Sequence, residues 1–148
     1  MWNAVKSVNL SLICTKLVMG LVVLFGVSAP RIVKLYVAYT AKNPDLILPL
    51  LITVYACVVP AMIALFCLNR MLENIKRERI FIDTNVQDLR RISWCCFAVS
   101  GILLLSGYYY LLFLMIAVAA AFFGLILRVV KNVIEQAINL KEENELTI

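Results

Sequence analysis

The sequence predicts an all-α integral membrane protein with four transmembrane helices and amphipathic cytoplasmic extensions. Of its 148 residues, 64% are apolar. Only 16% are charged, whereas soluble proteins carry about 25%. The apolar residues lie in stretches long enough to cross a bilayer, which takes about 20 residues of helix because lipid offers no partner for an unpaired backbone group. We therefore expect a single transmembrane domain over residues 1–148.

Four spans are predicted, at about residues 10–29, 46–68, 92–106 and 109–130. The last two form one apolar run, and "SGYYY" (106–110) is the expected turn between them, since Gly107 permits a backbone reversal and tyrosine suits the headgroup level. A cytoplasmic loop is expected at 69–91 and a cytoplasmic tail at 131–148. The outer loop, at 30–45, has too few polar groups to predict a ligand site.

The N-terminus has two features of a signal peptide, namely Lys6 before an apolar core and small residues at 27–29. Pro30 directly follows the position where cleavage would occur, which disfavours cleavage. We therefore expect a retained first helix.

Lysine and arginine are distributed unevenly beside the predicted spans. With both termini in the cytoplasm, ten of them lie on the cytoplasmic side and three on the outer side (Arg31, Lys34 and Lys42). Positive residues favour the cytoplasmic side, so the sequence predicts this orientation in a cytoplasmic membrane. It also places two tryptophans at the inner interface (Trp2 and Trp94) and five tyrosines at the outer one (Tyr36, Tyr39 and Tyr108 to Tyr110).

The residue types argue against an enzyme and predict no cofactor. The chain has no histidine, and none of its nine acidic residues lies inside a predicted span, so groups that titrate near neutral pH are missing from the membrane. It has no glycine-rich phosphate loop. The five cysteines form no CxxC pair, and we interpret them as small packing residues rather than redox centres or metal ligands.

Three features of the spans are open to a functional interpretation. Lys16 lies inside the first span, where a charge suggests function, although its side chain could instead reach the headgroups. Pro60 is expected to kink the second helix, either for gating or only for packing. The segment "AVAAAFFG" (117–124) has small residues four apart, typical of a helix-packing surface within the bundle or with a second copy.

The predicted loop combines helical and extended segments. The second helix should continue through "NRMLENIKRER" (69–79), and "IFI" (80–82) should be extended or turn-like and must be buried against something. "DTNVQ" (83–87) is typical of a helix start, with Asp83 or Thr84 as N-cap. Asn85 could cap or bind. The following segment is amphipathic, with its polar side formed by Gln87, Asp88, Arg90 and Arg91.

The tail is also amphipathic. Its apolar residues lie near one face of the expected helix (Val133, Ile134, Ala137, Ile138 and Leu140). An apolar stripe needs a cover in water, and the acidic end of the tail argues against an anionic lipid surface. We expect the loop, with its basic residues and "IFI", to pack on the tail and form a small cytoplasmic cap, which is either structural or a docking surface.

Several motifs resemble those of the domain-of-unknown-function 2975 (DUF2975) family of small bacterial four-span membrane proteins. They are Phe81 followed by Asn85, "LRRI" (89–92) before a span, and "LKEENELTI" (140–148) at the end of the chain. The resemblance covers the whole chain in motif order and layout. The family typically has a glycine in the turn before the phenylalanine, where this chain reads "RERIF" (77–81), which predicts a looser turn. The resemblance implies a bacterial cytoplasmic membrane and supplies no catalytic residues.

Such proteins are commonly encoded beside a small helix-turn-helix transcription regulator, which implies that the membrane protein binds, sequesters or signals to that regulator. The partner-binding residues predicted for it lie in the loop and tail (Phe81, Asn85, Leu89, Arg90, Glu142, Glu143, Asn144, Leu146 and Ile148). No direct nucleic-acid binding is expected; membrane lipid and a second copy of the chain are further expected partners. The alternative function is a small transport or immunity-type protein that acts through its spans, with Lys16 and Pro60 as working parts.

Overall fold

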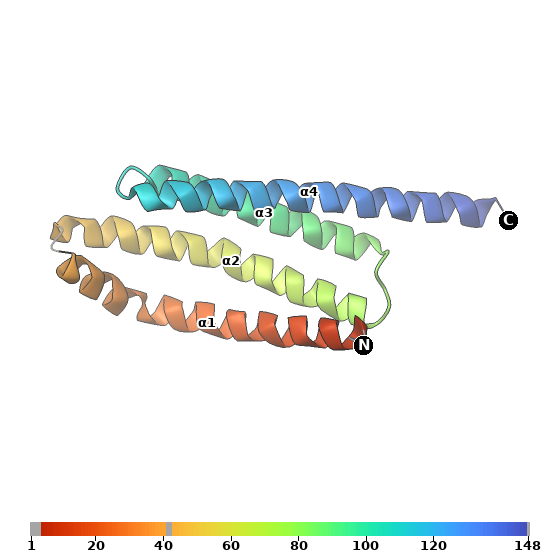
Figure 1. Cartoon of the computed structure of the whole chain (residues 1–148), viewed down its shortest axis with the longest axis horizontal. Coiled ribbons are helices and arrows are strands. Elements are labelled where there is room, and N and C mark those ends of the chain that lie inside the picture. Colours follow the sequence, from red (N-terminus) through yellow and green to blue (C-terminus); the bar gives the residue numbers. More distant parts are fainter. Residues whose placement is uncertain (1–3, 41–42, 148) are drawn as a thin grey trace.

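The computed structural model describes residues 4–40 and 43–147, which form long helices. In chain order these residues contain α1 (Ala4–Tyr39), the short 3-10 helix η1 (Pro44–Leu46), α2 (Ile47–Lys76), α3 (Asp83–Ser106) and α4 (Leu111–Leu146). Each of the four long helices is long and apolar enough to cross a membrane. The structure therefore confirms the predicted all-α fold with four candidate spans (Figure 1).

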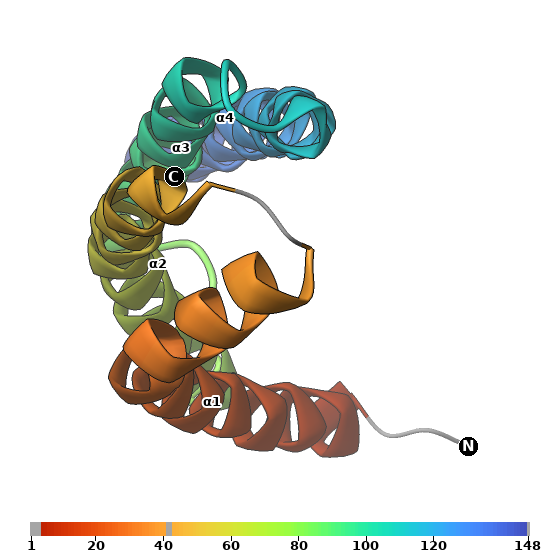
Figure 2. The ribbon, with the colours of Figure 1, turned by 90° about the vertical axis from the view of Figure 1, so that its left-hand side faces the viewer.

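The four helices form an open crescent rather than a closed bundle (Figure 2). Each packs on the next one along the chain, α1 on α2, α2 on α3 and α3 on α4. Within the described residues, the backbone of α4 does not approach α1 or α2. The side chain of Phe113, near the start of α4, packs against a cluster of Val33, Val37 and Leu50. This contact joins α4 to the first two helices at one end of the crescent.

The first helix is longer than predicted. α1 continues through Pro30 to Tyr39, so the prediction of an outer loop at 30–45 is wrong for most of its length. A proline inside a helix bends it more often than it ends it when the flanking residues can pack. Here Val33 and Val37 pack on Leu50, and Figure 2 shows α1 changing direction in its C-terminal half, which contains Pro30.

The predicted turn between the last two helices is confirmed, for a different reason than glycine flexibility. α3 ends at Ser106 and α4 begins at Leu111. Gly107 has an ordinary helical φ of -59°, so the turn does not use the backbone freedom of glycine. A Cβ at this position would lie 3.1 Å from the carbonyl oxygen of Leu104, which is a tight contact. The ring of Tyr110 packs at a tilt of 51° beside that of Tyr36 of α1, with ring centroids 6.1 Å apart, so tyrosines from two helices meet at this end.

Small residues and hydroxyl groups hold α3 against α4. The Ser93 hydroxyl donates a hydrogen bond to the carbonyl of Gly124 at 2.8 Å, and the Ser100 hydroxyl donates to the carbonyl of Ala117 at 2.8 Å. Such contacts need closely spaced backbones, which small residues allow. Ala117 and Gly124 of the predicted small-residue surface are buried in this interface, so these two residues pack within the protein. A homodimer remains a prediction without their support.

The turn after α2 is closed although it lacks the glycine typical of this position. The amide of Glu78 donates to the carbonyl of Ile75 at 3.0 Å, and the amide of Arg79 donates to the carbonyl of Asn74 at 3.0 Å. These are the two hydrogen bonds of a Schellman motif, in which the C′ residue adopts a left-handed conformation. Glu78 has that conformation, with φ 60°. The expected looser turn is therefore wrong, and Glu78 carries the strain.

Replacing Glu78 with glycine is expected to stabilise the protein by about 0.5 kcal/mol. The substitution removes a left-handed penalty of roughly 1 kcal/mol, part of which is offset by the greater freedom of glycine in the unfolded chain. Chemical denaturation in detergent micelles measures the difference. The exposed neighbour Arg77, as Arg77→Gly, provides the control, because Arg77 has φ -86° and should lose stability instead.

Candidate functional site

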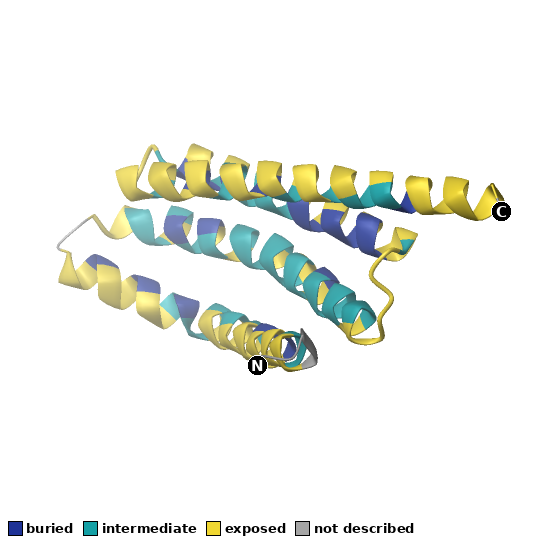
Figure 3. Cartoon of the chain, turned by 45° about the vertical axis from the view of Figure 1, so that its right-hand side comes forward, coloured by how far each residue is buried: buried dark blue, intermediate teal, exposed yellow. Residues whose placement is uncertain are grey.

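A buried polar junction joins the end of α2 to the start of α3. The start of α3 is among the most buried parts of the structure (Figure 3). Two polar residues there, Asn85 and Asp88, have the largest fully buried side chains of the described residues, 2% and 0% exposed. Buried polar groups are costly unless they are hydrogen-bonded, and both of these side chains have partners on α2.

Asp88 is held by an arginine from the preceding helix. Nε of Arg70 donates to Oδ2 of Asp88 at 2.8 Å, and Nη2 of Arg70 donates to Oδ1. This two-point geometry is the strong form of an arginine–carboxylate pair. The hydrogen bond to Asp88 raises the pKa of Arg70. The pair fixes the position of α3 relative to α2 while Arg70 remains 39% exposed to the outside.

The prediction that Asp88 lies on the polar side of α3 with Gln87 is wrong. Its charge can be buried because Arg70 neutralises it. A signal for this was present in the sequence, because Asn85, Asp88 and Ile92 follow the helical spacing of a buried stripe. The apolar pattern alone did not reveal that a charge on this stripe has a partner 18 residues earlier.

Asn85 organises the loop. Its Nδ2 donates to the carbonyl of Arg79 at 3.0 Å and to the carbonyl of Ile80 at 2.9 Å, and its Oδ1 accepts a hydrogen bond from Asn74 at 3.0 Å. All these partners lie in α2 or the loop, so Asn85 caps loop carbonyls. The predicted N-cap by Asp83 or Thr84 is wrong, since the helix begins at Asp83 and Ile82 is the N-cap residue with no side-chain cap.

The other predicted loop residues have different environments. Leu89 is buried, Arg90 is exposed, and Phe81 is 50% exposed. Ile80 is also exposed. Ile82 is extended, with φ -132° and ψ 146°, and Phe81 lies in a bend, which fits the predicted extended or turn-like conformation. The prediction that the segment is buried is wrong for Ile80 and Phe81 among the described residues. The loop thus presents two large apolar side chains at the surface.

The tail extends beyond the rest of the crescent (Figure 1). α3 and α4 are antiparallel, and Ser93 of α3 lies opposite Gly124 of α4. Asp83, ten residues before Ser93, therefore lies level with Ile134, ten residues after Gly124. The apolar face is covered only up to Ile138, which is the last buried residue described in α4. Val133 and Leu140 are exposed. The backbones of α2 and α4 do not approach each other within the described residues, so α2 does not lie beside the tail.

The predicted tail residues are grouped at the projecting end of α4. Glu142, Glu143 and Asn144 are exposed, and Leu146 is 88% exposed. Ile148 lies outside the described residues. The structure therefore separates the predicted partner-binding residues into a buried pair, Asn85 and Leu89, and two exposed groups at the same end of the crescent.

Lys16 lies exposed on α1. Among residues 4–40 and 43–147 it forms no ion pair. Likewise, in the part of the chain that the structure describes, no three histidine, cysteine or acidic residues are placed to hold a metal ion.

Comparison with known proteins identifies the chain by its sequence. Residues 36–148 match the family described as "Protein of unknown function (DUF2975)". The match begins at Tyr36, later than the whole-chain resemblance, and includes the polar junction, the loop and the tail. Comparisons with curated proteins and with solved structures gave no match. Since the matched region is well over half of the chain, this protein belongs to the DUF2975 family.

Proposed function

We propose that this protein is a membrane-embedded regulatory protein that binds a small helix-turn-helix transcription regulator. The contact surface is the projecting end of α4 together with the α2–α3 loop. Both termini face the cytoplasm of a bacterium in this proposal, in agreement with the excess of lysine and arginine at the loop end.

The observation that carries the proposal is the exposure of the tail. Beyond Ile138 the helix carries large apolar side chains, Leu140 and Leu146, without a cover in the described residues. An exposed apolar surface of this kind is typical of an interaction site. Ile80 and Phe81 add a second exposed apolar group at the same end.

The charge of the tail favours a basic partner. Glu142, Glu143 and Glu145 lie beside the exposed leucines, and Glu145 is paired with Lys141 at 3.9 Å. DNA-binding proteins carry basic surfaces that contact phosphate. An acidic helix that docks on such a surface would compete with DNA, which is how the membrane protein would sequester the regulator.

The test is recovery of partners from the native cells with three baits. We expect the full-length protein and Lys16→Leu to recover a small helix-turn-helix protein, and a chain ending at Asn139 to lose it. Mass spectrometry of the detergent-solubilised complexes provides the measurement. Equal recovery with the shortened chain would refute the assignment to the tail.

A charge variant tests the electrostatic step. We expect Glu142→Gln with Glu143→Gln to weaken regulator binding by about tenfold, in the range for charges at an interface rim. The matched control, Asp45→Asn with Glu73→Gln, removes two exposed acidic groups outside the tail and the α2–α3 loop and should change binding less than about threefold. Equal losses in both pairs would mean that overall charge, and not the tail, decides binding.

Transport through the spans is less well supported. A groove of about 230 Å³ has a lining from all four long helices, but its lining residues are uncharged. Lys16 is not among them. A Lys16→Leu variant that abolished the physiological effect of the protein while retaining the regulator would favour this alternative.

A further inference from the structure

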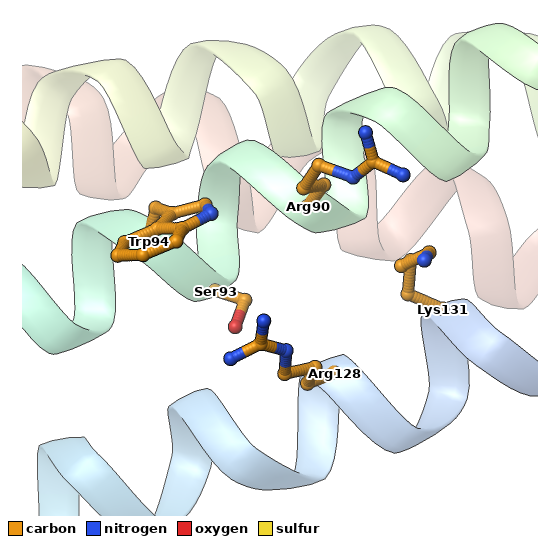
Figure 4. A pocket seen from close by; sticks show the side chains of 5 residues that line it. All are labelled: Arg90, Ser93, Trp94, Arg128 and Lys131. Carbon is orange, nitrogen blue, oxygen red and sulfur yellow. The ribbon is translucent and has the colours of Figure 1, made fainter.

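A basic pocket lies between α3 and α4, and none of its lining residues belongs to the projecting end of α4 beyond Ile138 or to the α2–α3 loop at 77–82. It has a volume of about 170 Å³ and is lined by Arg90, Ser93 and Trp94 of α3 and by Arg128 and Lys131 of α4. Figure 4 shows the side chain of Arg128 reaching from α4 towards Ser93 and Trp94 on α3. Three cationic side chains thus surround one small space.

The positive charge of the pocket is only partly neutralised. Glu135 lies 2.6 Å from Lys131 and 3.9 Å from Arg90, and the hydrogen bond from Lys131 lowers the pKa of Glu135. Among the described residues, Arg128 has no carboxylate within ion-pair distance, and its guanidinium instead lies 5.9 Å from the centre of the Trp94 ring. One acidic group therefore faces three cations, which favours an anionic ligand.

The pocket lies at the depth of lipid headgroups. Arg128 follows Leu111, the first residue of α4, by 17 positions, and a helix rises about 1.5 Å per residue, so the two are separated by roughly 26 Å. The hydrocarbon core is about 30 Å thick. Trp94 is 60% exposed, and tryptophan is enriched at the interface between membrane and water. The pocket therefore opens near the boundary between hydrocarbon and water.

We propose that this pocket binds a phosphate group, as carried by an anionic phospholipid of the adjacent leaflet. The guanidinium groups of Arg90 and Arg128 offer pairs of donors that match phosphate oxygens, and the ammonium of Lys131 adds a third point of contact. The volume is several times the roughly 30 Å³ that one water molecule occupies, which leaves room for a phosphate. Basic pockets between membrane helices suit lipid headgroups. The proposal does not rest on regulator binding, although Arg90 is also one of the partner-binding residues predicted from the sequence.

Trp94 allows a direct test with lipids that carry bromine on their chains and quench nearby tryptophan. Trp2, the other tryptophan of the chain, is replaced by phenylalanine, and the full-length protein is placed in phosphatidylcholine nanodiscs. We expect brominated phosphatidylglycerol to quench Trp94 at a mole fraction roughly tenfold lower than brominated phosphatidylcholine requires, as expected for more than one cation acting at a membrane surface.

Arg128→Gln is the informative variant, because it removes a charge without breaking an ion pair of the described residues. We expect it to lower the preference for phosphatidylglycerol about fivefold, whereas Arg128→Lys retains part of it. Arg77→Gln, an exposed loop position, removes the same charge outside the pocket and should leave the preference unchanged. Equal losses in Arg128→Gln and Arg77→Gln would overturn the proposal, as would equal quenching by the two lipids.

A second arm distinguishes lipid from soluble phosphate. Inorganic phosphate is added to the protein in phosphatidylcholine alone, against chloride at equal ionic strength, and Trp94 emission is measured. A phosphate-specific change that Arg128→Gln removes supports the pocket with soluble phosphate as its ligand. A response to phosphatidylglycerol without one to inorganic phosphate supports the lipid. No response in either arm contradicts a phosphate site.

Discussion

Replacing Arg70 with methionine is expected to destabilise the protein by about 3 kcal/mol, because it leaves the carboxylate of Asp88 buried without a countercharge. Asp88 is 0% exposed, and Arg70 donates two hydrogen bonds to its carboxylate. The expected effect is at the low end for a broken buried pair, since water still reaches the 39% exposed Arg70 side chain. The measurement is the denaturation midpoint in mild detergent.

Two further variants separate the ion pair from a general effect of the substitution. Arg77→Met makes the same change at an exposed position and should shift stability by less than about 0.5 kcal/mol. Combining Arg70→Met with Asp88→Leu removes both charges, and we expect it to recover most of the loss, because apolar replacement of a whole buried pair is often neutral or better. A double variant as unstable as Arg70→Met alone would contradict this account of the junction.

The spans could be predicted because lipid imposes a simple requirement on composition. Uninterrupted apolar runs, such as 92–130 with its turn at Gly107, locate helices whatever their neighbours are. The arrangement of the helices could not be predicted in the same way. The open crescent depends on which face of each helix contacts the next one. The continuation of α1 through Pro30 depends on the packing of Val33 against Leu50 of α2, which the sequence of α1 alone does not specify.

The exposure of a candidate site residue could be predicted where it follows from the residue's place along its own helix. It could not be predicted where it depends on a side chain from another helix. The projecting tail follows from the length of α4. Asn85 was predicted to cap or bind, and its side chain donates to the carbonyls of Arg79 and Ile80 in the loop rather than capping the start of α3. Asp88 was misplaced because its burial is decided by Arg70, on another helix. The pocket of Arg90, Arg128 and Lys131 was missed for the same reason, although Arg128 and Lys131, three positions apart, lie on one face of a helix.

The tail is attached to the rest of the protein through two contacts in series, the α3–α4 interface and the polar junction between α2 and α3. The tail is the continuation of α4, and α4 contacts the rest of the protein mainly through α3. α3 is in turn fixed to α2 by Arg70 and Asp88. A partner that binds the tail and moves it would therefore displace α3 first. The packing of the α3–α4 interface decides how much of that movement is transmitted to α3.

Replacing Gly124 with leucine is expected to loosen this interface by about 2 to 3 kcal/mol, since extra atoms in a well-packed contact force the neighbours apart. Even a Cβ at Gly124 would lie 3.2 Å from the Phe97 ring and 3.3 Å from Cβ of Cys96. Separation of the helices would also lengthen the hydrogen bond from Ser93 to the carbonyl of Gly124, which is 2.8 Å long. The denaturation midpoint in detergent gives the magnitude.

Trp94 reports the same displacement, because the guanidinium of Arg128 on α4 lies 5.9 Å from the centre of its ring. In protein with phenylalanine in place of Trp2, Gly124→Leu should shift the Trp94 emission. Gly101→Leu is the matched control, since it makes the same change in α3 at a position where a Cβ meets nothing within 4 Å. It should preserve both stability and emission, and a similar loss at the two glycines would show that the α3–α4 contact is not the cause.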